Sequence, residues 1–244
     1  MARLTTMPPL VLDRTQLAAF GAQWIANGQS LSRTPPYSSG QLGAFFDQAV
    51  GQALATMLGG IPISSSSANS LTPPPPPPRS PHADCVEVGP VRIIGGVRPQ
   101  NFDVGYRPDG VRFAFDSKTL NDRKSIGKNW QNMINDLATE ATTVHSRFPH
   151  AVVAFLVALP EPVAEPAQRS AIIETLERLA RRTNVAGPDY MAEAITLVLW
   201  NPADGVIDPN VPAPASPLRY ERFSEQVEAA YVSRYKGLPP HATG

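Results

Sequence analysis

Two aspartates and a lysine lie around a short turn in residues 100–118, QNFDVGYRPDGVRFAFDSK. Apolar residues alternate with polar or small ones on both sides of the turn, which is typical of a β-hairpin. Pro108-Asp109-Gly110 suits the turn, because proline presets φ, aspartate bonds its own backbone and glycine accepts a positive φ. Such a hairpin places Asp103 opposite or diagonal to Asp116, with Lys118 one pleat further along. The two carboxylates are then within reach of one divalent cation.

These residue types together suit the hydrolysis of a phosphodiester. Mg²⁺ held by carboxylates lowers the pKa of a bound water and acts as a Lewis acid. Its ligands would come from Asp103, Asp116 and the backbone carbonyl of Ser117. Lys118 would lie near the attacking water and the scissile phosphate, where an ammonium orients the nucleophile or stabilises charge on phosphorus. The alternative is an exposed hairpin on which Asp116 and Lys118 merely pair, worth well under about 1 kcal/mol.

The hairpin resembles the active-site motif of the PD-(D/E)xK nuclease superfamily, to which many restriction endonucleases belong. The matching residues are Asp103 on the first strand and Asp116-Ser117-Lys118 on the second, with Asn101-Phe102 where the name-giving proline would be expected. The resemblance implies an α/β fold with a restriction-endonuclease-like core, in which helices flank a central mixed β-sheet. It also implies Mg²⁺ as the cofactor. It covers roughly residues 40–160, which should run helix, three strands, helix, strand.

The elements before the hairpin fit this order. Residues 40–58 carry apolar side chains at helical spacing and are predicted to form the first core helix. Asp47 lies in that helix and, by the resemblance, matches an acid that helps to hold the metal; a solvated surface aspartate is the alternative. Residues 84–97 are predicted to form a strand or a strand pair, and Glu87 within them is a further candidate acid.

The elements after the hairpin fit as well. Ser125 is the predicted N-cap of a helix whose apolar stripe extends over about five turns to Val144. The resemblance places this helix beside the active site, which makes Lys128 and Gln131 candidate contacts for DNA phosphate; a solvated helix face is the alternative. Arg112 on the hairpin is a third candidate phosphate contact. The apolar run 151–159 predicts a strand buried on both faces.

The whole chain, residues 1–244, is predicted to be a single nuclease domain with additions to its core. Residues 13–27 should form a helix capped by Asp13. A proline-rich insertion at about 61–81 contains six consecutive prolines, which form a polyproline II rod. This rod is interpreted as a surface linker, with a ligand for an SH3-like partner as the alternative.

The C-terminal extension, residues 165–235, is predicted to run helix, strand, helix. Its first helix should occupy 165–183, with Arg178, Arg181 and Arg182 near its C-terminal dipole. A strand at 194–200 and a helix at about 220–235 complete it.

Composition excludes several classes of protein. Its 21 basic and 21 acidic residues leave the 244-residue chain without the strong positive charge of a non-specific nucleic-acid binder. Residues 92–128 nevertheless carry a modest basic surplus, which suits phosphate contacts. The single cysteine, Cys85, excludes an internal disulfide and a multi-cysteine zinc site. We find neither a signal peptide nor an apolar run of membrane-spanning length, and therefore expect a cytoplasmic protein without a membrane partner.

The sequence therefore predicts a Mg²⁺-dependent endonuclease that hydrolyses double-stranded DNA, most simply a Type II restriction enzyme. A homodimer is expected, because a palindromic site mirrors two-fold protein symmetry. Two alternatives stay open: a repair, recombination or defence nuclease of the same fold, and a non-catalytic module that binds DNA or protein. A hydrolase that uses Asp103 and Asp116 as an acid–base pair is disfavoured by the neighbouring lysine.

Overall fold

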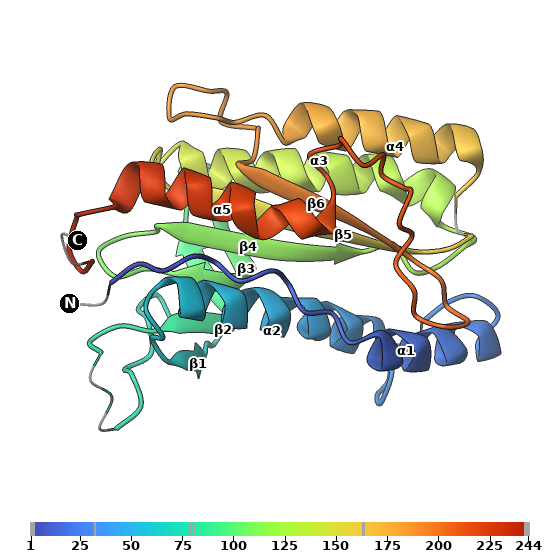
Figure 1. Cartoon of the computed structure of the whole chain (residues 1–244), viewed down its shortest axis with the longest axis horizontal. Coiled ribbons are helices and arrows are strands. Elements are labelled where there is room, and N and C mark those ends of the chain that lie inside the picture. Colours follow the sequence, from blue (N-terminus) through green and yellow to red (C-terminus); the bar gives the residue numbers. More distant parts are fainter. Residues whose placement is uncertain (1–2, 32, 79, 81, 163, 242–244) are drawn as a thin grey trace.

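The computed structural model describes residues 3–31, 33–78, 80, 82–162 and 164–241. These residues form an α/β fold in which helices flank a six-stranded mixed sheet, as predicted (Figure 1). The elements in chain order are α1 (Arg14–Ala26), α2 (Ser39–Met57), β1 (Ile63–Ser65), β2 (Val86–Ile94), β3 (Pro99–Tyr106), β4 (Phe113–Thr119), α3 (Ile126–His145), β5 (Val152–Pro160), α4 (Pro166–Leu179), β6 (Ala194–Trp200) and α5 (Tyr220–Tyr235).

The strands lie in the sheet in the same order as in the chain. The pairs β2–β3 and β3–β4 are antiparallel, and the pairs β1–β2, β4–β5 and β5–β6 are parallel. From α2 to β5 the order is helix, three strands, helix, strand, once the short β1 is set aside. Residues 84–97 contribute a single strand, β2, whose pairing with β3 is interrupted by an irregularity between Val88 and Val91.

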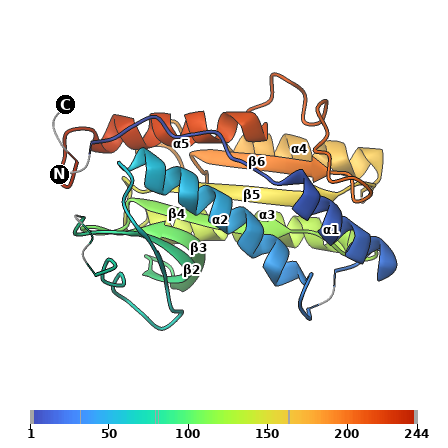
Figure 2. The same ribbon diagram turned by 60° about the horizontal axis from the view of Figure 1, so that its bottom comes forward.

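The helices form two layers around the sheet. Helices α1, α2 and α5 cover one face, and α3 and α4 cover the other (Figures 1 and 2). All nine residues of β5 and all seven of β6 are buried, as expected for parallel strands covered by helices on both faces. In the first layer the rings of Phe115 on β4 and Phe223 on α5 pack edge to face. The sheet and both layers therefore share one continuous apolar core.

Local signals explain most of the element boundaries. The carboxylate of Asp13 accepts hydrogen bonds from the backbone N–H groups of Thr15 and Gln16 and so starts α1. A capping box between Ser38 and Gln41 starts α2. Gly110 in the hairpin loop has φ of +130°, a conformation that L side chains rarely adopt.

Three features differ from the prediction. Ser125 is the N-cap residue of α3, as predicted, but its hydroxyl donates to the carbonyl of Asp122 and makes no capping hydrogen bond with a helix N–H group. Helix α4 ends at Leu179, so Arg182 lies beyond the helix. Residues 63–65 of the proline-rich insertion form strand β1, which pairs with β2. The composition of the insertion predicts a surface linker and does not predict this strand. Residues 79 and 81 of that insertion lie outside the described residues.

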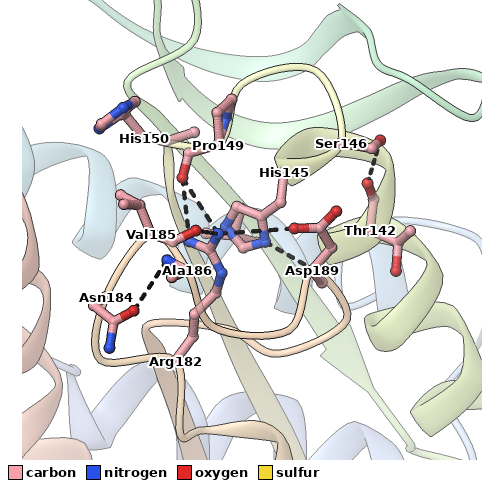
Figure 3. A network of polar contacts seen from close by, with 12 residues as sticks. Thr142, His145, Ser146, Pro149, His150, Arg182, Asn184, Val185, Ala186 and Asp189 are labelled. Atoms are coloured by element: carbon pink, nitrogen blue, oxygen red, sulfur yellow. Dashed lines mark hydrogen bonds and ion pairs between the residues drawn. The ribbon is translucent and has the colours of Figure 1, made fainter.

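A buried ion cluster fastens the amino ends of β5 and β6. Glu193 accepts hydrogen bonds from the guanidinium groups of Arg182 (2.7 Å) and Arg234 (2.8 Å) and from the backbone N–H of Val153 (2.8 Å). His145 Nε2 lies 3.2 Å from Glu193, and its Nδ1 lies 2.9 Å from the carbonyl of Asp189. Figure 3 shows Arg182 reaching the carbonyls of Pro149 and Val185 beside His145. These contacts tie α3, β5, β6 and α5 together at one end of the sheet.

No helix within the described part of the chain is both long enough and apolar enough to span a bilayer.

Candidate active site

The site forms where strands β3 and β4 separate, next to Asp103 and Asp116; this place is called the fork. Their register pairs Tyr106 with Phe113 and Val104 with Phe115, and one further step places Asp103 opposite Asp116. The described ladder ends at Val104 and Phe115, while β3 stays paired with β2 as far as Pro99. Beyond that point Asp103 Oδ2 accepts hydrogen bonds from the backbone N–H (2.9 Å) and the hydroxyl (3.2 Å) of Ser117. The carboxylate of Asp103 thus takes the place of a β3 carbonyl at the fork of the hairpin.

Asp116 and Lys118 lie at the same fork. The carboxyl groups of Asp103 and Asp116 are within hydrogen-bonding reach of each other, as the hairpin register predicts. The ammonium of Lys118 donates to Asp116 Oδ2 and, at 2.9 Å, to Oε1 of Glu140 on α3. The structure therefore brings together the three residues that the sequence selected for catalysis, and it adds a fourth.

Asp47 reaches the fork from helix α2. Its side chain is buried, and its Oδ1 atom has no hydrogen-bond partner among the described residues. The neighbouring Ser117 side chain favours the charged form of the Asp47 carboxyl, whereas the negative charge of Asp103 disfavours it, so both residues act on Asp47. Asp47 is therefore not a solvated surface aspartate; it lies beside Asp103 and Ser117, and its role as a metal ligand stays a prediction.

Crowding and burial disturb the protonation of these acids. Burial raises the pKa of Asp47, and the charge of Asp103 raises it further. Burial likewise raises the pKa of Asp103, helped by the hydrogen bond and charge of Asp116. For Asp116, burial raises the pKa to about 6 although Lys118 opposes the shift. The site thus gathers more negative charge than one ammonium neutralises, and either protons or a cation would relieve it.

The donor atoms fit a hard cation. Mg²⁺ prefers carboxylate and carbonyl oxygens, and the fork offers Asp103, Asp116 and the orphaned Oδ1 of Asp47. In the arrangement seen here Lys118 engages Asp116, and the described residues contain no group of three His, Cys, Asp or Glu side chains already set for a metal. Ser117 contacts Asp103 through its N–H and hydroxyl groups; a ligand role for its carbonyl stays a prediction.

An open cleft of about 620 Å³ leads to the fork. Its walls come from the loop after α1, the N-terminal half of α2, the end of β4 and the start of α3. Asp47, Asp103 and Ser117 line it where it meets the fork, and most of the other lining residues are polar or glycine. The cleft lies at the carboxyl end of β4, the edge at which open α/β sheets usually bind ligands.

The candidate phosphate contacts divide into two groups. Lys128 and Gln131 are exposed on the first turns of α3, next to Asn129, which lines the cleft. Arg112 is buried at the other end of β4, roughly 13 Å of strand away from Asp116. It donates to Asp109 and to the carbonyl of Pro239, and its guanidinium lies 4.7 Å from the ring centroid of Tyr235. The prediction that Arg112 contacts DNA is therefore not supported, because its donors serve internal packing.

Glu87 does not belong to the site. Its carboxylate is fully buried and forms a two-pronged ion pair with Arg107, at 2.7 and 2.6 Å. Its Oε2 also accepts a hydrogen bond from the hydroxyl of Ser66 (3.1 Å), so both oxygens already have partners away from the fork.

Comparison of the chain with protein-family models, curated proteins and solved structures found no match.

The sequence did not reveal Glu140, although a signal was present. On α3 the buried residues Leu137, Ala141 and Val144 form an apolar stripe, and Glu140 lies within it. An acid at a core position is costly without a partner, so its presence there indicates a buried polar contact. The cation that Glu140 contacts, Lys118, lies on β4, 22 residues away in the chain. Helical periodicity carries no information about a contact between α3 and a strand.

Proposed function

We propose that the protein is a Mg²⁺-dependent endonuclease of double-stranded DNA that uses the active-site plan of the PD-(D/E)xK superfamily. The observation that carries the proposal is the meeting of Asp103 and Asp116 at the fork of β3 and β4, with the Lys118 ammonium bound to Asp116. The order of elements from α2 to β5 and the buried Asp47 support it independently.

Each residue has a distinct task in this proposal. Asp103, Asp116, Asp47 and the carbonyl of Ser117 would hold Mg²⁺, which when bound supplies Lewis acidity and an acidified water. Ser117 orients Asp103 through two hydrogen bonds. Burial would lower the pKa of Lys118, but the charges of Asp116 and Glu140 outweigh it and raise the pKa above its ordinary value. Lys118 therefore acts as a permanent cation that orients water or neutralises phosphate, and not as a general base.

The cleft offers a path for one DNA strand to the fork. Gly40 and Gly43 lie on its α2 wall and leave room for close approach of a sugar–phosphate backbone. Arg33 and Asn129 line it as well, and the starts of α2 and α3 add backbone dipoles that favour phosphate. If Lys128 and Gln131, exposed on the first turns of α3, also contact phosphate, this surface would position the duplex without reading its sequence.

Plasmid cleavage in Mg²⁺ tests the proposal. We expect Asp116→Asn and Lys118→Ala to lose at least about 100-fold in rate, since each removes a group that contacts the reacting phosphate, water or metal. Lys236→Ala is the matched control, because Lys236 is an exposed lysine at the end of α5 and does not line the cleft. Chelation by EDTA should stop wild-type cleavage. The proposal fails if both variants cleave like wild type, or if folded wild type cleaves no form of DNA; the latter supports a non-catalytic binding module.

We further propose sequence-specific cleavage by a homodimer, as in a Type II restriction enzyme. Discrete fragments from a large DNA, together with a dimer mass by light scattering, are the expected results. A smear of fragments would instead indicate the repair or defence nuclease.

A further inference from the structure

Glu140 is the one acid at the fork that comes from the α3 layer. It is 3% exposed, and its Oε1 accepts hydrogen bonds from Lys118 Nζ at 2.9 Å and from Gln100 Nε2 at 3.0 Å. Its Oε2 atom is buried without a hydrogen-bond partner among the described residues. Half of this carboxylate is thus desolvated without compensation, so its placement at a core position calls for a function beyond stability.

Asp116 has two tasks that compete for one oxygen. In this structure its Oδ2 accepts from Lys118, while the proposed function asks the same carboxylate to bind a divalent cation. If the Asp116 carboxylate binds a metal ion, its hydrogen bond with the Lys118 ammonium weakens or breaks, and the positive metal ion also repels the ammonium. A lysine on four rotatable bonds would then leave the site unless another anion kept it.

We propose that Glu140 is the positioning residue that keeps Lys118 at the fork when Asp116 is engaged elsewhere. Helix α3 holds Glu140 from outside the hairpin, and Gln100 fixes the very oxygen that Lys118 contacts. Lys118 therefore has two anchors on two separate elements, of which only Asp116 is a proposed metal ligand. The expected effect of Glu140 on DNA cleavage rests on the proposed function. The contact by which Glu140 holds Lys118 does not depend on it.

Amine labelling followed by mass spectrometry tests the anchoring without metal or DNA. The other lysines, Lys124, Lys128 and Lys236, are exposed and serve as internal references. With either anchor alone, in Asp116→Ala or Glu140→Ala, we expect Lys118 to label within about threefold of its wild-type rate. In the double variant it should label at least tenfold faster, because no carboxylate holds it. If Asp116→Ala alone labels as fast as the double variant, Glu140 is no anchor and the inference is overturned.

Isosteric variants protect this test against misfolding. If the double alanine variant melts below the assay temperature, Asp116→Asn and Glu140→Gln replace it. The rise in labelling of the double variant should then be smaller, because each amide retains an acceptor oxygen, and the same comparison of single and double variants decides.

Cleavage kinetics test the consequence. Glu140→Ala should lower kcat at least tenfold and leave KM within twofold, because Glu140 acts on Lys118 and does not contact DNA. Glu140→Gln, which retains an acceptor oxygen, should recover part of the loss. Asp136→Ala, an exposed acid on the same helix, is the control. An unchanged kcat in Glu140→Ala overturns the inference. Absence of cleavage by wild type would overturn the proposed function instead, and the labelling result would still decide the anchoring.

Discussion

The carboxyl side chains at the fork are placed where their charged forms destabilise the fold. Asp47, Asp103 and Asp116 are crowded and largely desolvated, and the pKa of each carboxyl is raised. Natural proteins commonly tolerate such local cost at functional sites. This loss of folding stability depends on pH, because protonation of the carboxyl groups removes the buried negative charge that causes it.

Replacement of Asp103 by asparagine should stabilise the protein at alkaline pH. The folded-state pKa of Asp103 lies above the unfolded value of about 3.9, so the folded protein binds the extra proton. Its favourable contribution is complete below that value and is lost as pH rises through the folded pKa. We therefore expect Asp103→Asn to gain roughly 1 kcal/mol in unfolding free energy at pH 8 and little at pH 4. Urea titrations at both pH values measure this. An equal destabilisation at both would contradict it.

At the scale of elements, helix α2 both packs the core and shapes the cleft. Its buried side chains include Leu42, Phe46 and Val50, while Gly43 lies on the cleft wall. A Cβ atom at Gly43 would lie 3.4 Å from the hydroxyl of Ser117, which is close to ordinary contact. A side chain can therefore be added there without displacing the backbone of the fork.

Filling the cleft from α2 should impair activity and leave the fold intact. We expect Gly43→Leu to lower kcat/KM for DNA at least about tenfold, because the new side chain occupies the strand path. Stability should hold or rise, since leucine favours a helix over glycine by up to about 1 kcal/mol. Ala44→Leu is the control, because Ala44 is exposed one residue away. Equal cleavage by both variants would show that the cleft is not the path.

Across the whole molecule, the candidate active site and the buried ion cluster lie at opposite ends of the strands. The fork lies towards the carboxyl end of β4, and the ion cluster around Glu193 lies at the amino ends of β5 and β6. Burial alone would raise the pKa of Glu193, but the hydrogen bond and charge of His145 and the charge of Arg234 outweigh it and lower the pKa to about 2. The cluster therefore stabilises the fold in the pH range where the fork destabilises it.

Loss of the Glu193 charge should weaken the whole fold. We expect Glu193→Gln to cost about 3–5 kcal/mol at pH 7, because it removes the buried carboxylate that the guanidinium groups of Arg182 and Arg234 share. The folded pKa is depressed, so the stabilisation is present above the unfolded value of about 4.3 and is lost as pH falls towards 2. Denaturant titrations should show the gap to wild type narrowing over that range. Glu174→Gln, at an exposed position on α4, is the control; a gap independent of pH would refute the argument.

The sequence by itself determined the elements that local rules govern. Hairpin alternation placed Asp103 opposite Asp116, helical spacing located α2 to within a residue at each end, and apolar runs located β5 and β6. Periodicity and turn chemistry act over a few residues, so they can be read without a fold.

Only the tertiary structure decided which side chains meet across elements. It showed that Lys118 contacts Glu140 and that Glu87 pairs with Arg107. It also showed that Arg112 is buried and that β1 belongs to the sheet. Each of these contacts joins segments that the chain brings together only on folding, and the alternatives differ in desolvation and charge rather than in local pattern. A buried acid on an apolar stripe indicates that a hydrogen-bond donor or a cation lies nearby, but only the packing of the elements determines which residue that is.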